Sequence, residues 1–253
     1  MINPTMAMIP SGYGQDKIYS LLPTNGDGDI TFNRSSVAYR TNENGLVSEV
    51  ATDYPRLDWS DSNCPAIMIE RSGANELHKS EDLDSSVWNK TLGNTVTPNV
   101  TIGPDGTLSA AKLESDGTQS YARIWQQVNL TGTTAVSAYV KEHVGDRVYF
   151  YNSGTFNNDN GNTEFVHGIS FNFGSKQFEN ESDLLYSSLL DSNVEELDNG
   201  WFRLSLLLPS AALNRFQMMA QDGFGTAVQS VFIWGVMAEE ATDLSSYIKN
   251  TSA

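Results

Sequence analysis

The stretch FVHGISFNFG at residues 165–174 decides the fold. Within it the large apolar residues Phe165, Ile169 and Phe171 alternate with small or polar ones such as Ser170. Successive side chains of a β-strand point to opposite faces, so a period of two sustained over this length predicts a strand with one buried face.

Similar patterns return along the chain and predict an all-β fold. Apolar and polar residues alternate in the segments 136–140, 147–151 and 202–208. The segment 228–238 is apolar on both faces, which is typical of a central strand covered from both sides. Eight or more short strands at hairpin spacing predict an antiparallel β-sandwich.

Helical patterns are weak. Residues 80–88 could form one or two helical turns, with Ser80 as the N-cap and Leu83 and Val87 on one face. Residues 182–190 hold four leucines and form either a helix or a loop.

Residues 1–75 differ from the rest because turn signals crowd together there, for example at 25–29 and 42–45. The apolar pieces between them are too short to close a core alone. We therefore predict an extended N-terminal arm with hairpins over residues 1–75, followed by the β-sandwich over residues 76–253. The arm would pack on a larger body, either its own C-terminal domain or a neighbouring subunit.

The composition excludes several classes of protein. The chain has 253 residues, with 15 Lys and Arg against 31 Asp and Glu and a formal charge of −16. At that charge, and without a run of Lys and Arg, phosphate repulsion excludes nucleic-acid binding. No stretch approaches about 18 continuous apolar residues, so we expect no membrane insertion. The first twelve residues lack the cationic region of a signal peptide, and the single Cys64 excludes an intrachain disulfide.

No set of catalytic residues is found, so we expect no enzymatic activity and no cofactor. His78, His143 and His167 are scattered and form no metal-binding pair. A glycosidase needs two carboxylates about 5–10 Å apart across a cleft, which adjacency in sequence does not provide. We therefore predict that the acidic pairs at 195–196 and 239–240 are solvated charges at strand ends.

The oxygen-rich run NGDGD at residues 25–29 admits two interpretations. It lacks the glycine and the glutamate of an EF-hand loop, because Ile30 and Ser36 stand at those positions. The run forms either a hairpin turn, which we favour, or a calcium loop of another kind. We assign no metal ligand in the chain.

Two groups of polar and aromatic residues are the best candidates for ligand contact. In the segment 121–128, Ala122, Ile124 and Val128 suit the core, and alternation places their neighbours on the opposite face. The candidate glycan-binding residues are Tyr121, Arg123, Trp125 and Gln127, followed by Tyr149, Tyr151 and Asn152. Aromatic rings stack on the C–H face of a pyranose, while polar side chains bind its hydroxyls.

An alternative is that these residues pack under the arm or at a subunit interface, where Tyr, Trp and Arg are enriched. Three further tryptophans, Trp88, Trp201 and Trp234, lie among apolar or turn residues. We predict that they belong to the core.

Two groups of motifs carry a resemblance to a known family. The arm holds GY at 12–13, KIYS at 17–20, LP at 22–23, NGDGD at 25–29, FNRSSVAYR at 32–40, PRLD at 55–58 and CPAIMIE at 64–70. The module after it holds SED at 80–82, PDGT at 104–107, AKL at 111–113, SAYVK at 137–141, NGWFR at 199–203 and WG at 234–235. In this order, over nearly the whole chain, they resemble bacteriophage virion appendage proteins with a carbohydrate-binding-module-like β-sandwich.

The chain departs from that family at two places. The family more often has Gln and Leu where Met237 and Ala238 stand. The insert at 179–193 is also longer than usual, which leaves its conformation open.

The resemblance implies a fold and a setting. The fold is a jelly-roll or carbohydrate-binding-module-like sandwich, and the setting is the virion surface, as a tail fibre, a tail-tip protein or a capsid decoration. Residues 1–75 would bind other virion proteins during assembly in the bacterial cytoplasm, where a chain without disulfides is expected. The symmetry common in such appendages implies a homo-oligomer, for example a trimer.

We therefore predict a non-enzymatic virion structural protein that binds host glycans weakly and multivalently. Two alternatives stay open. One is an assembly or cement protein with no sugar ligand, and the other is a tail-associated polysaccharide depolymerase. The sequence does not choose between head and tail.

Overall fold

The computed structural model describes residues 33–60, 65–118, 121–154, 165–179, 189–209, 213–221 and 228–253. Strands and turns dominate these residues, and one short 3-10 helix, Asp198–Gly200, occurs among them. No helix in this part of the chain is long and apolar enough to cross a membrane. The oxygen-rich run at 25–29 and most of the segment 182–190 lie outside the described residues.

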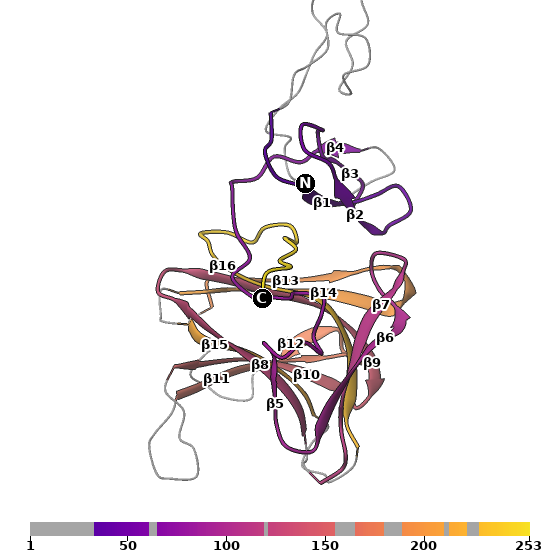
Figure 1. Cartoon of the computed structure of the whole chain (residues 1–253), viewed down its shortest axis with the longest axis vertical. Coiled ribbons are helices and arrows are strands. Elements are labelled where there is room, and N and C mark those ends of the chain that lie inside the picture. The colour runs from indigo at the N-terminus through magenta and orange to yellow at the C-terminus, as the bar shows by residue number, and fades with distance from the viewer. Residues whose placement is uncertain are drawn as a thin grey trace, which may run out of the picture.

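The described residues form two small antiparallel pairs and two six-stranded sheets (Figure 1). The pairs are β1 (Ala38–Thr41) with β2 (Val47–Val50), and β3 (Leu57–Asp58) with β4 (Ala66–Ile67). We call these four strands and their turns the hairpin layer.

The sheet next to the hairpin layer is called the upper sheet, as it lies in Figure 1. In spatial order it consists of β13 (Asp191–Glu196), β14 (Trp201–Leu208), β9 (Thr134–Val144), β16 (Ser230–Glu240), β7 (Leu108–Ser115) and β6 (Asn94–Ile102). The lower sheet consists of β12 (Gln177–Glu179), β11 (Phe165–Asn172), β10 (Arg147–Gly154), β15 (Leu213–Gln221), β8 (Tyr121–Leu130) and β5 (Asn89–Lys90). The strands pair antiparallel throughout, which confirms the predicted fold class.

The predicted strands are found where the alternation placed them. The stretch 165–174 contains β11, the segment 202–208 lies in β14, and the doubly apolar segment 228–238 is largely β16. β16 lies between β9 and β7 inside the upper sheet, as expected for a strand covered on both faces.

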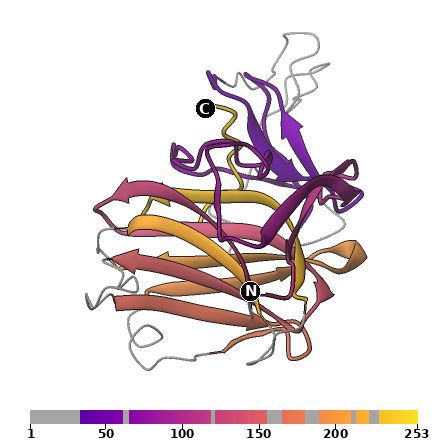
Figure 2. The same ribbon diagram turned by 60° about the horizontal axis from the view of Figure 1, so that its bottom comes forward.

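The main core lies between the two sheets, which Figure 2 shows stacked face to face. Ala122, Ile124 and Val128 of β8 contribute to it, as predicted, together with Leu113 of β7 and Ile233 of β16 from the facing sheet. Trp88 is also buried in this core.

A second apolar cluster covers the outer face of the upper sheet. Its buried members are Tyr39, Val47, Ala110, Tyr139, Trp201, Trp234, Met237 and Tyr247. Tyr39 and Val47 come from β1 and β2, so this hairpin packs on the chain's own sandwich. The role of residues 1–75 as an assembly arm, and the domain boundary at residue 75, stay predictions.

Residues 80–88, which could form one or two helical turns, contain no helix. The segment forms consecutive turns, in which the amides of Asp82, Ser85 and Trp88 each bond the carbonyl three residues earlier. The backbone of Ser80 instead pairs with Asn250 and Val236. Because the Ser80 amide and carbonyl bond to these distant residues, the segment does not begin with helical hydrogen bonds.

A β-bulge in β16 couples the upper sheet to the segment before residue 80. The register between β16 and β9 shifts between Trp234 and Met237, where Gly235 has a φ of +57°. The amide of Val236 donates to the Ser80 carbonyl at 3.0 Å instead of to β9. Bulges of this kind accept a positive φ most readily at glycine.

Gly235→Ala is therefore expected to lower the free energy of unfolding by about 1–3 kcal/mol. A Cβ at this position would also lie 3.1 Å from the Tyr139 ring and 3.3 Å from the Tyr247 ring. Urea unfolding followed by circular dichroism measures the loss. Gly132→Ala, where a Cβ meets Glu240 at 3.4 Å or more, is the control, and an equal loss in both variants would contradict this account.

Candidate functional site

The outer face of the lower sheet is the surface on which the predicted ligand-contact residues meet. Phe216, Met218 and Ala220 of β15 point into the core, so Arg215, Gln217 and Met219 point the other way. The same alternation in β8 and β10 places Arg123, Trp125 and Gln127 together with Tyr149 on this outer face. The register aligns Trp125 with Gln217, and Met219 with both Arg123 and Tyr149.

The accessible part of this face centres on Trp125, near the short edge strand β5. Trp125 is half-buried, and the Arg215 guanidinium lies over its ring at 4.2 Å from the centroid. On the strand's other side, Asn89 of β5 pairs with Trp125 and is exposed. A stacked guanidinium holds the indole in one orientation and contributes about 0.5–1 kcal/mol at exposed sites.

Two further side chains provide hydrogen-bonding groups beside the indole. Arg123 is half-buried, and its Nε donates to the Thr91 hydroxyl at 2.9 Å. Gln127, two residues after Trp125 on the same face of β8, is exposed. Donors and acceptors therefore border the ring on the same face.

Gln217 adds a buried acceptor next to Trp125. Its side chain is 2% exposed, and its Oε1 has no hydrogen-bond partner among the described residues. A buried amide oxygen without a partner is costly, because desolvation is not repaid. A ligand hydroxyl that donates to it would remove that cost.

Tyr149 corrects one expectation. It lies on the predicted face, but its side chain is only 3% exposed, so its ring offers no stacking surface in this structure. The side chains of Tyr121, Tyr151 and Asn152 lie outside the described residues, although their backbones belong to β8 and β10. Their role in binding stays a prediction.

The sequence prediction missed Arg215, Gln217 and Asn89. Alternation in the stretch RFQMMA at 215–220 carried the signal for the first two, because Phe216, Met218 and Ala220 are apolar at every second position. Asn89 carried no signal, since β5 has only two residues.

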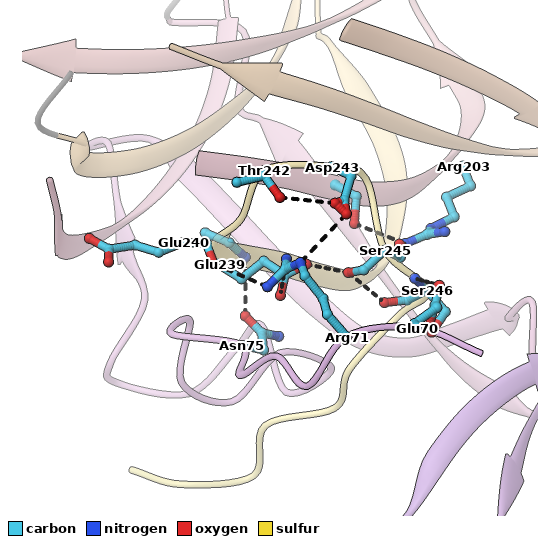
Figure 3. A network of polar contacts seen from close by, with 12 residues as sticks. Glu70, Arg71, Asn75, Arg203, Glu239, Glu240, Thr242, Asp243, Ser245 and Ser246 are labelled. Atoms are coloured by element: carbon cyan, nitrogen blue, oxygen red, sulfur yellow. Dashed lines mark hydrogen bonds and ion pairs between the residues drawn. The ribbon is translucent and has the colours of Figure 1, made fainter. Parts of the chain in front are cut away.

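On the opposite side of the sandwich, a polar network ties the C-terminal segment and the residues before Asn75 to the upper sheet (Figure 3). At its centre Glu239 is 1% exposed, which contradicts the predicted solvated pair at 239–240. The Arg71 guanidinium lies 3.1 Å from Glu239, and the Ser245 hydroxyl donates to the same carboxylate. This pairing allows the charge to be buried, whereas Glu240 is exposed as expected.

Glu70, which is half-buried, forms a second link in this network. The Arg56 guanidinium lies 2.6 Å from its carboxylate, and the Ser246 amide donates to it at 2.8 Å. Burial acts to raise the pKa of Glu70, but the hydrogen bond from the Ser246 hydroxyl and the Arg56 charge outweigh burial. The pKa of Glu70 therefore lies below its ordinary value.

A lowered pKa makes this link sensitive to acid. Its stabilisation is complete above the unfolded-state pKa of about 4.3 and is lost as the pH falls through the lower folded-state pKa. Glu70→Gln is expected to cost about 1–2 kcal/mol at pH 7 and progressively less below pH 4. The urea midpoints of the wild type and the variant, measured from pH 7 to pH 2.5, test this prediction. A difference between the two midpoints that widens in acid would contradict it. Glu43→Gln, an exposed change in the β1–β2 turn, is the control.

Comparisons with known proteins give structural similarity only. No protein-family model and no curated protein sequence matches the chain. Among solved structures, the enzymatically active domain of bacteriophage CBA120 tailspike protein 4 aligns at 13% identity with a TM-score of 0.36, covering 65% of this chain and 21% of the tailspike chain.

Two carbohydrate-binding modules align over nearly their whole length. A family 29 module matches at 9% identity with a TM-score of 0.39, covering 69% of this chain and 98% of the module. The CBM22-1 xylan-binding domain from Paenibacillus barcinonensis Xyn10C matches at 14% identity with a TM-score of 0.39, covering 69% of this chain and 100% of the domain. Identities and TM-scores at this level do not transfer a ligand or an activity.

Proposed function

We propose that this protein binds glycans without cleaving them, through the outer face of the lower sheet around Trp125. The observation that carries the proposal is the grouping of an indole, stacked by Arg215, with the buried and unpartnered amide oxygen of Gln217. Ligand sites typically combine apolar or aromatic surface with a few placed polar groups.

Each part of this grouping suits a pyranose ring. The indole offers a flat apolar surface to the axial C–H groups of the sugar, and Arg215 keeps that surface in place. The Gln217 Oε1 accepts a hydroxyl hydrogen, while Gln127 and Asn89 at the edge both donate and accept. A neutral or charged sugar could satisfy these groups; the face alone does not choose the sugar.

We further propose that the protein is displayed on a virion surface, as the motif resemblance implies. Single sites built on one aromatic platform bind weakly, so many copies on one particle would supply avidity. In this proposal residues 1–75 contact other virion proteins and the lower sheet faces outward. Electron microscopy of a particle containing the protein would test this arrangement, and a lower sheet facing the shell would overturn it.

A glycan array with the purified chain coupled to multivalent beads tests glycan binding. The wild-type chain should retain a subset of glycans, and Trp125→Ala should lose them. Trp59→Ala is the matched control, because Trp59 is also half-buried but directly follows β3, away from the lower sheet. No retained glycan in the wild type would favour an assembly protein without a sugar ligand. Release of soluble saccharide from the array would establish a depolymerase instead.

A further inference from the structure

A polar cavity of about 190 Å³ lies between the hairpin layer and the outer face of the upper sheet. Its lining comes from the hairpin layer and the residues next to it (β1, Val47, Asp58, Ser60, Met68 and Glu70), from strands β13, β14 and β9 of the upper sheet, and from the C-terminal residues 244–247. At about 30 Å³ per water molecule, it has room for about six waters. That space suits one sugar ring and not an oligosaccharide.

Arg203 on β14 lines this cavity and holds a donor that no described residue uses. Its Nη2 donates to the Ser245 carbonyl at 2.6 Å, and its guanidinium lies 5.7 Å from the Tyr139 ring centroid. Figure 3 shows the side chain reaching toward Ser245. The Nε of Arg203 is buried and has no hydrogen-bond partner within the described ranges. An acceptor atom inside the cavity would satisfy it.

Carboxylates hold acceptor oxygens around the same space. Asp58 accepts hydrogen bonds from the amides of Thr41 at 2.8 Å and Ser60 at 3.1 Å, which fix its orientation. The Ser60 hydroxyl also donates to Oδ2, so Oδ1 is the oxygen that keeps capacity for another donor. The Tyr139 and Tyr247 side chains add apolar surface to the lining.

The charges of the lining select the class of ligand. Glu70 is paired with Arg56, so Asp58 and Glu195 balance Arg40 and Arg203 and the lining carries no net charge. An anion or an ammonium group would bring one unbalanced charge into this lining. A neutral polyol avoids that, because each hydroxyl can donate to a carboxylate and accept from Arg203.

We propose that this cavity binds a single neutral pyranose unit, as a second site that is separate from the lower-sheet face. The inference is independent of the proposed function. The cavity and the Trp125 face lie on opposite sides of the sandwich, so either site can fail without the other.

Saturation-transfer NMR with the purified full chain tests the cavity. The neutral probes are glucose, galactose, mannose and N-acetylglucosamine; glucuronate is the anionic probe and glucosamine the cationic one. At least one neutral sugar should bind both the wild type and Trp125→Ala, and the charged probes should bind at least about ten-fold more weakly. Arg203→Gln should weaken that binding about ten-fold or more.

Asn193→Phe provides a second variant that leaves the core intact, because Asn193 is exposed on the edge strand β13 and also lines the cavity. The larger ring should block the cavity and remove the saturation-transfer signal. If Arg203→Gln fails to fold, Asn193→Phe tests the proposal in its place. The proposal is overturned if no neutral sugar binds. It is equally overturned if binding survives Asn193→Phe, or if Trp125→Ala alone removes it, which would assign the signal to the lower sheet.

Discussion

Asn75→Ala is expected to lower the free energy of unfolding by about 3–5 kcal/mol, a loss typical of breaking a buried hydrogen-bond network. The Asn75 amide is 5% exposed and makes four hydrogen bonds to backbone groups. Its Nδ2 donates to the carbonyls of Val236 at 2.9 Å and Ile248 at 2.8 Å. Its Oδ1 accepts from the amides of Leu77 at 3.0 Å and Ala238 at 3.1 Å.

The size of the effect follows from what truncation leaves behind. Three segments meet at this amide: the chain before the sandwich, the bulge of β16 and the C-terminal segment. Alanine can make none of these four hydrogen bonds. The backbone groups of all three segments would therefore lose their partner while they stay buried.

Urea unfolding monitored by tryptophan fluorescence measures this prediction. Asn44→Ala is the matched control, because Asn44 is exposed in the β1–β2 turn. We expect the control to change stability by less than about 0.5 kcal/mol. A loss below about 1 kcal/mol for Asn75→Ala would mean that water replaces the amide, and that these three segments are not fixed by it.

Trp125→Ala is expected to weaken the binding of any retained glycan by about 30-fold or more, the effect of losing a contact worth at least about 2 kcal/mol. The variant removes the stacking surface and also releases Arg215 from the ring. Isothermal titration with a glycan selected on the array gives the affinity ratio.

Two companion variants separate the causes. Trp125→Phe keeps an aromatic surface and should recover most of the affinity. Arg215→Gln removes the cation above the ring and should weaken binding by about three- to ten-fold. Equal affinity of the wild type and Trp125→Ala would exclude this face as the binding site.

The period-two patterns predicted the sheets because the strands are half-buried and regular. In β8 the alternation separated Ala122 and Ile124 from Arg123 and Trp125, and the structure confirms that division. Such patterns report on which side of a strand a residue lies. They do not report what covers that side, which is why Tyr149 was expected to be accessible and is buried.

Features that depend on contacts distant in sequence escaped prediction. The burial of Glu239 requires Arg71, and the function of Asn75 requires Val236 and Ile248. Nothing local distinguishes Asn75 from the many other asparagines of the chain. Residues 80–88 form turns without a helix for the same reason, because long-range pairing of Ser80 overrides a weak local pattern.

The most direct test of glycan binding at the lower sheet is an amide chemical-shift titration of the isotope-labelled full chain with its best array glycan. The proposal predicts saturable shifts confined to residues 89–91, 123–127 and 215–219, together with the Trp125 indole signal. Shifts centred on the hairpin layer, or no saturable shifts at all, would contradict it.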